Sequence, residues 1–228
     1  EKLQKDILMM LQAAKTEKTF NKIFGIVSPH AGYMYSGKTA AYVYNLLKDK
    51  NYKTVIVISP SHAEYFPGIS IYDGDAYETP LGIVEIDQTI TDKLVENSKT
   101  IFRGIQGHRK EHALEVQIPF LQSVLKNFKI VPIVMGDQGR MYVDELAQKI
   151  SKTVDDKTLV VASSDMSHFY SSEEADRLDS VVEKRINDFD YDQLLIDLDD
   201  HECEACGGGP IAAMMKAASL QSITNPLV

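Results

Sequence analysis

The chain has 228 residues, and its 33 Asp and Glu residues outnumber its 24 Lys and Arg residues, which gives a formal net charge of −9. A protein that neutralises many phosphates needs a basic face, so this charge argues against a nucleic-acid partner and against an anionic membrane surface. The two cysteines, Cys203 and Cys206, exclude a secreted disulfide scaffold, and the apolar runs fall short of the roughly 20 residues of a membrane span.

Hydrophobic periodicity predicts an amphipathic N-terminal helix, followed by β-branched runs that predict strands and by segments of helical period. The helix at the N-terminus carries Leu3, Ile7, Leu8 and Leu11. The expected strands cover residues 23–27, 54–58, 69–72, 130–134 and 159–162. The expected helices cover residues 38–47, 87–96, 113–125, 143–154, 173–188, 191–198 and 210–218. Residues 65–82, rich in Gly, Asp and Tyr, predict a hairpin, a long excursion or a plain connection.

The alternation of strands and helices predicts an α/β fold with a mixed or mostly parallel central sheet, covered by helices on both faces. No linker or low-complexity tract interrupts this alternation, so we expect a single domain over residues 1–228. The N-terminus also differs from a signal peptide, because its charges are mixed and its apolar residues are spaced. A cytoplasmic protein is the expectation.

Three of the predicted strands end in a serine that is followed by a histidine. His30 follows Ser28, His62 follows Ser59 and Ser61, and His168 follows the third strand a few residues after its end. In open α/β sheets the ligand crevice lies outside the carboxyl ends of the strands. We therefore expect these histidines to meet in one crevice, although any single histidine also fits a structural or surface role.

Two histidines with one anionic ligand are typical of iron and copper sites that keep open coordination positions. Cys206 is the candidate for the anionic ligand, because it leads into a Gly-rich turn and a helix whose N-terminus lowers a thiol pKa. A thioredoxin-like dithiol of Cys203 and Cys206 stays open as an alternative. The glycines at 207–209 lack the spacing and lysine of a phosphate-binding loop.

Two further pairs of titratable residues have two interpretations each. Asp165 and His168 could orient each other for proton transfer, or Asp165 could cap the following turn. His112 and Glu115 are three residues apart on a predicted helix, so they share a face and either support the pocket or pair at the surface.

Six motifs in the same order resemble the Memo family, called AmmeMemoRadiSam system protein B in microbes. They are Ser-Pro-His-Ala-Gly-Tyr at 28–33, Ser-Pro-Ser-His at 59–62, Thr-Pro-Leu-Gly at 79–82, Glu-His-Ala-Leu-Glu at 111–115, Ser-Ser-Asp-Met-Ser-His at 163–168 and Cys206-Gly207 before Pro210. The resemblance spans about residues 25–218 and implies the fold of the LigB-like class III extradiol dioxygenases. The family's Phe-Tyr-Pro-like start and its C-terminal region are not matched, so we expect terminal segments to be missing.

The resemblance also implies roles for individual residues. His30, His62 and Cys206 match the metal ligands, and Asp165 and His168 match catalytic pocket positions, with His168 as the acid/base. The other expected pocket residues are Ser28, Tyr33, Ser61, His112, Glu115 and Cys203. The dioxygenases carry a carboxylate where this chain has Cys206, and a thiolate shifts the expected metal from iron towards copper or zinc.

Three functions follow as hypotheses. The first is a metal-dependent redox enzyme that acts on a small molecule. The second is a non-catalytic module that recognises a peptide or an anionic or aromatic ligand through the same pocket. The third is an accessory role beside a radical SAM partner, since the chain has no three-cysteine cluster motif of its own.

Overall fold

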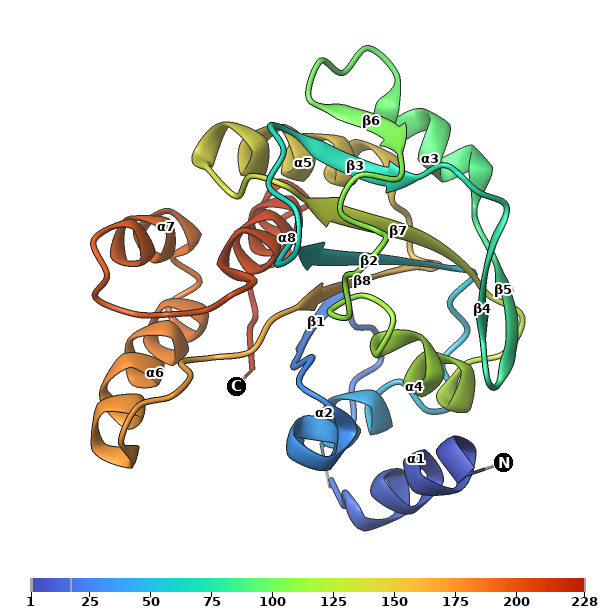
Figure 1. Cartoon of the computed structure of the whole chain (residues 1–228), viewed down its shortest axis with the longest axis horizontal. Helices are drawn as coiled ribbons and strands as arrows, with labels where there is room; N and C mark the ends of the chain where they lie inside the picture. Colours follow the sequence, from blue (N-terminus) through green and yellow to red (C-terminus); the bar gives the residue numbers. More distant parts are fainter. Residues whose placement is uncertain (1, 17, 228) are drawn as a thin grey trace.

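The computed structural model describes residues 2–16 and 18–227, and its centre is a six-stranded sheet of order β1-β8-β2-β7-β3-β6 (Figure 1). Strands β1, β8, β2 and β7 are parallel, β3 is antiparallel to β7, and β6 is parallel to β3. The strands of this sheet are β1 (Gly25–Ser28), β2 (Thr54–Pro60), β3 (Ile69–Tyr72), β6 (Ile101–Gly104), β7 (Lys129–Met135) and β8 (Thr158–Ser163). The expected mostly parallel α/β sheet is confirmed.

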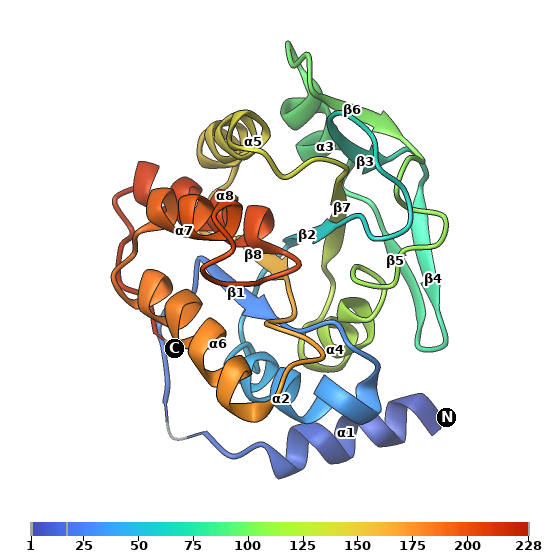
Figure 2. The same ribbon diagram turned by 60° about the vertical axis from the view of Figure 1, so that its left-hand side comes forward.

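Helices cover both faces of the sheet, as Figures 1 and 2 show. One face carries α1 (Lys2–Ala13), α2 (Tyr33–Asn45) and α4 (Gln117–Val124). The other carries α3 (Gln88–Val95), α5 (Arg140–Thr153), α7 (Tyr191–Asp199) and α8 (Gly208–Leu220), with α6 (Ser172–Asn187) packed on α7. This arrangement is compatible with the LigB-like fold. Within the part of the chain that the structure describes, none of the helices has both the length and the apolar character to cross a bilayer.

The central strand β2 shows why the sheet has two cores. Val55 and Val57 belong to the core beneath α1, α2 and α4, whereas Ile56 and Ile58 belong to the core beneath α5 and α8. Successive side chains of a strand point to opposite faces, so a strand covered on both sides must be apolar throughout. This is why the sequence signal for β2 was a continuous apolar run.

The two short strands β4 (Ala76–Thr79) and β5 (Gly82–Glu85) form a separate antiparallel hairpin. The hairpin predicted within residues 65–82 therefore exists, but it starts later and ends at Glu85. Gly82 has φ +121° at the turn, in a region that side chains rarely adopt. Strand β6 was not predicted, because it has four residues and only Ile101 is buried.

The helix predicted from residue 113 begins instead at Gln117. Pro119 has no N–H to donate, so it fits only the first turn of an α-helix, where that donor has no partner within the helix. Residues 113–116 form a turn before it. The N-terminal helix α1 was predicted correctly, with Ile7 and Leu11 buried, although Leu8 is 42% exposed.

Candidate metal centre

Three neighbouring strands deliver the candidate residues to one edge of the sheet. β8 lies between β1 and β2 in the sheet. The loop after β8 carries Asp165 and His168, the loop after β1 carries His30, and the loop after β2 carries His62. The rings of His30 and His62 lie edge to face, with centroids 5.1 Å apart and an interplanar angle of 74°. The expected convergence of histidines at the carboxyl ends of the strands is therefore present.

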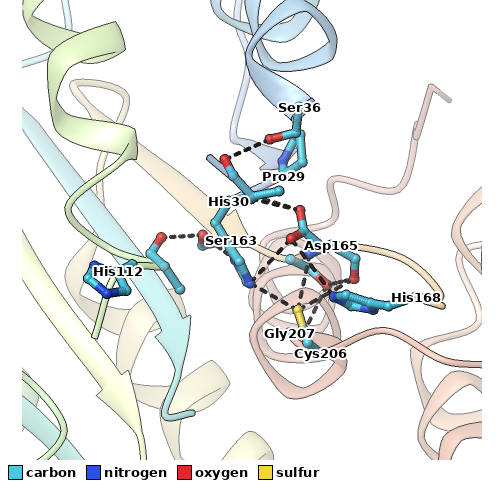
Figure 3. Close-up of polar contacts among 12 residues, drawn as sticks. Pro29, His30, Ser36, His112, Ser163, Asp165, His168, Cys206 and Gly207 are labelled. Atoms are coloured by element: carbon cyan, nitrogen blue, oxygen red, sulfur yellow. Dashed lines mark hydrogen bonds and ion pairs between the residues drawn. The ribbon is translucent and has the colours of Figure 1, made fainter. Parts of the chain in front are cut away.

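Cys206 reaches the same place from the start of α8. Its Sγ lies 3.0 Å from His30 Nε2 (Figure 3). The ligand atoms of His30, His62 and Cys206 all lie within 4.8 Å of one another. The close approach of α8 to β8 depends on Gly207, because a Cβ there would lie 2.1 Å from the backbone oxygen of Ser163. A His/His/Cys group that could hold a metal ion is thus formed.

His30 presents Nε2 to this group because of the hydrogen bonds around Ser163. The Ser163 hydroxyl donates to the Ala113 carbonyl at 2.5 Å and accepts from Gln117 Nε2 at 2.7 Å. Its remaining lone pair faces His30 Nδ1 at 2.9 Å, so Nδ1 must carry the proton. Nε2 is then the ring nitrogen that faces Cys206 Sγ and is left for the metal group.

Whereas the ring of His30 is oriented by a hydroxyl, the ring of His62 is oriented by a carboxylate. Its Nδ1 lies 3.0 Å from Glu111 Oε1, and its backbone N–H donates to Glu111 Oε2 at 2.5 Å. The Glu111 side chain is 2% exposed, whereas that of His62 is 47% exposed. Since a carboxylate only accepts, it selects the Nδ1–H form of His62 and leaves Nε2 for the metal group.

The surroundings of Cys206 favour its thiolate over its neutral thiol. Burial alone raises the pKa of the Cys206 thiol, but hydrogen bonds from His30 and His62 outweigh it and lower the pKa to about 6. Hydrogen bonds to Cys206 and then to Glu111 raise the pKa of His62 to about 10. At neutral pH the metal-free group therefore holds a thiolate beside an imidazolium, and a bound cation would replace the imidazolium proton.

Asp165 lies between two imidazoles. Its Oδ1 accepts from the backbone N–H groups of His30 and Ala31, at 2.8 and 3.2 Å. Its Oδ2 lies 3.9 Å from His30 Nε2 and 4.0 Å from His168 Nε2. Asp165 thus fixes the backbone of the loop after β1 and faces His168, whose side chain is 40% exposed (Figure 3).

Other residues predicted for the pocket have structural contacts. The hydroxyls of Ser28, Tyr33 and Ser61 donate to the backbone oxygens of Pro29, Val116 and Glu64, respectively. His112 and Glu115 pair with each other at 3.0 Å, and their side chains are 79% and 59% exposed. Figure 3 shows His112 apart from the group around Cys206. The surface interpretation of this pair therefore fits the structure.

Both cysteines are free thiols. Cys203 is 1% exposed within the core beneath α5 and α8, and burial raises its pKa to about 11, which does not suit a reactive dithiol. Cys203 and Cys206 both line an open pocket of about 510 Å³, together with His168, Asp137, Glu204 and Gly209. Of the three candidate metal ligands, Cys206 lines this pocket, so the pocket adjoins the metal group on its sulfur side.

The supporting roles of Glu111 and Gln117 were not predicted, although Glu111 begins the Glu-His-Ala-Leu-Glu motif at 111–115. Glu111 lies in an irregular segment without periodicity, and Gln117 lies in an apolar helix as its only polar buried residue. That isolated buried amide was the one available sign, because a buried amide needs hydrogen-bond partners.

Comparison with known proteins identifies the family. The family model described as Memo-like protein matches residues 1–225. The chain belongs to the Memo family. It is 37% identical to a MEMO1 family protein of Thermoplasma volcanium over 192 residues, which cover 84% of this chain and 71% of that protein. It is 35% identical to a MEMO1 family protein of Nitrosopumilus maritimus over 197 residues, covering 86% and 72% of the two chains. The Memo resemblance of the motifs is confirmed.

A third relative agrees with this assignment. The chain is 36% identical over 207 residues to a MEMO1 family protein of Methanococcus maripaludis, and the match covers 87% of this chain and 72% of that one. The His30, His62 and Cys206 group therefore belongs to a Memo-like protein.

Proposed function

We propose that this Memo-like protein binds an iron or copper ion between His30, His62 and Cys206 and acts as a metal-dependent oxidoreductase on a small molecule. The observation that carries the proposal is the convergence of three ligand atoms within 4.8 Å. The donor set fits a transition metal, since both imidazoles have Nδ1 occupied by hydrogen bonds and Cys206 favours the thiolate.

Three protein ligands leave coordination positions free, as in catalytic metal sites. The metal, when bound, would supply a position for a small ligand and a route for electron exchange. His168 is the residue placed to exchange protons with a molecule in the pocket, because it lines the pocket and is partly exposed. Asp165, fixed by the backbone of the loop after β1, would hold the orientation of His168.

The test is metal analysis of protein purified without oxygen. We expect stoichiometric iron or copper in the wild-type protein and its loss in His30→Ala and Cys206→Ser. His112→Ala is the control, since this histidine is exposed and contacts Glu115. Metal content that is the same in both ligand variants as in the wild type would reject the site.

A second candidate is binding without turnover through the same pocket. It is supported by two exposed aromatic rings beside this pocket, which Asp137 and His168 line. The hydroxyl of Tyr65 donates to Asp137, and the ring of Phe169 lies next to that of His168. Such rings could receive a peptide or an aromatic ligand. Affinity for a tyrosine-containing peptide that persists in metal-free protein and in Cys206→Ser would favour binding over catalysis.

A further inference from the structure

We infer that one short segment, residues 111–117 at the start of α4, positions both histidine ligands of the proposed centre. Glu111 holds His62 directly, and Ala113 with Gln117 holds His30 through Ser163. This inference rests on the proposed metal site and adds the residues that orient its ligands. We call residues 111–117 the positioning segment.

Glu111 forms the His62 side of this arrangement. Its carboxylate accepts from the backbone N–H and the Nδ1–H of His62, at 2.5 and 3.0 Å. It also accepts from the backbone N–H groups of His112 and Ala113, each at 2.9 Å. A buried carboxylate is stable only where donors surround it, and among the described residues these donors come from His62 and the positioning segment. The carboxylate therefore ties the two segments together.

Ala113 and Gln117 form the His30 side. The Ser163 hydroxyl donates its proton to the Ala113 carbonyl and accepts a hydrogen bond from the Gln117 amide. Only its second lone pair is left, so it can only accept from His30. Gln117 Nε2 also donates to the backbone oxygen of Pro29 at 3.0 Å. Tyr44 donates to Gln117 Oε1 at 2.6 Å and so fixes which way the amide points. The segment thus sets both the ring and the loop of His30.

The consequence for the metal site is a matched pair of tautomers. An imidazole can coordinate through Nε2 only when Nδ1 carries the proton and the ring is turned inward. Because both supports belong to the same seven-residue stretch, a displacement of that stretch would misorient both ligands together. Loss of a hydrogen-bond partner of a metal ligand typically weakens metal binding by about 10–100-fold.

Glu115 offers a matched control within the same segment. It has the same charge and side-chain length as Glu111, but it is 59% exposed and pairs with His112 at the surface. Glu111→Gln and Glu115→Gln therefore remove the same charge from neighbouring positions, and only the first replaces one of the two oxygens that accept from His62 with an amide N–H donor.

The experiment is a titration of wild type, Glu111→Gln and Glu115→Gln with Co²⁺, followed by visible absorption, together with nitrogen-15 NMR of the histidine rings. We expect Glu111→Gln to weaken Co²⁺ binding by about 10–100-fold and Glu115→Gln to change it by about twofold at most. The Nδ1–H signal of His62 should shift in Glu111→Gln, because a neutral amide replaces the carboxylate beside it, and should stay at the wild-type position in Glu115→Gln.

Wild-type affinity and an unchanged His62 signal in Glu111→Gln would overturn the inference. Failure of the wild-type protein to bind Co²⁺ would instead reject the proposed function itself. If Glu111→Gln does not fold, Ser163→Ala applies the same test to His30, whose Nδ1–H would lose its acceptor. Unchanged Co²⁺ affinity in folded Ser163→Ala would also overturn the inference.

Discussion

Cys206 distinguishes this site from one with two histidines and a carboxylate, because its third ligand atom is a sulfur. Its thiolate is favoured by hydrogen bonds from His30 and His62 despite burial. A thiolate is a soft ligand, which favours copper(I) and zinc, whereas a carboxylate favours harder ions. The choice of metal should therefore follow this one side chain.

Cys206→Asp tests this dependence. We expect the variant to lose preference for copper(I) and to retain iron(II) when both ions are offered together without oxygen, because a carboxylate replaces the soft donor. Elemental analysis after gel filtration measures the ratio of the two metals. A copper share equal to that of the wild type would contradict the prediction.

His108 provides a second prediction at this scale, away from the metal group. Its Nε2–H donates to the Ser70 carbonyl, its Nδ1 accepts from Tyr77, and burial lowers its pKa to about 4. An unfolded histidine has a pKa of about 6.5, so falling pH protonates the unfolded chain first and destabilises the folded one. This loss begins near pH 6.5 and is complete below about pH 4.

Between about pH 7.5 and pH 5 we expect His108 to reduce the free energy of unfolding by about 2 kcal/mol. His108→Gln keeps the hydrogen-bonding groups and removes the titration. Urea unfolding at both pH values should therefore show a smaller pH effect in the variant than in the wild type. Equal pH effects in the two proteins would rule out this role of His108.

Elements with strong periodic signals were predictable, and those held by long-range contacts were not. β2 and β8 read as continuous apolar runs because both faces of the sheet are covered, and Cys206 could be placed at a helix start from the glycines that follow it. β6 is too short and too exposed to give such a signal. The role of Glu111 depends on His62, 49 residues away in the chain, which no local pattern encodes.

The junction between β8 and α8 gives a prediction for an element. A Cβ on Gly207 would lie 2.1 Å from the Ser163 oxygen and 2.7 Å from the Ser164 Cβ, so Gly207→Ala must push α8 away from the sheet. We expect a stability loss of about 1–3 kcal/mol and weaker metal binding, since Cys206 moves with the helix.

Gly32→Ala is the control for this variant. Gly32 also precedes a helix, α2, but a Cβ there would have Tyr35 as its nearest neighbour at 3.7 Å, an ordinary contact. Thermal unfolding and Co²⁺ titration should leave this variant close to the wild type. Similar losses in the two variants would show that close approach of α8 is not the cause.

Two hydrophobic cores share a single sheet, and this arrangement determines how the whole molecule unfolds. Leu146 on α5 and Leu121 on α4 are both fully buried, on opposite faces. Because β2 and β8 contribute side chains to both cores, neither core can persist after the sheet is lost. The single domain predicted over residues 1–228 should therefore unfold in one step.

We expect Leu146→Ala and Leu121→Ala each to lower the free energy of unfolding by about 2–5 kcal/mol. In both variants, urea unfolding followed by circular dichroism and by tyrosine fluorescence should give coincident single transitions. Two separated transitions, with each variant shifting only one, would show instead that the two halves unfold independently.

The two edges of the sheet affect how readily the protein aggregates in concentrated solution. Its edge strands, β1 and β6, have four residues each, whereas the inner strands β2 and β7 have seven. Open strand edges are templates for aggregation between molecules, and short edges limit that pairing. After β1, Pro29 has no N–H to offer to an added strand. The strand that leads into the His30 loop is thereby protected from joining a neighbouring molecule.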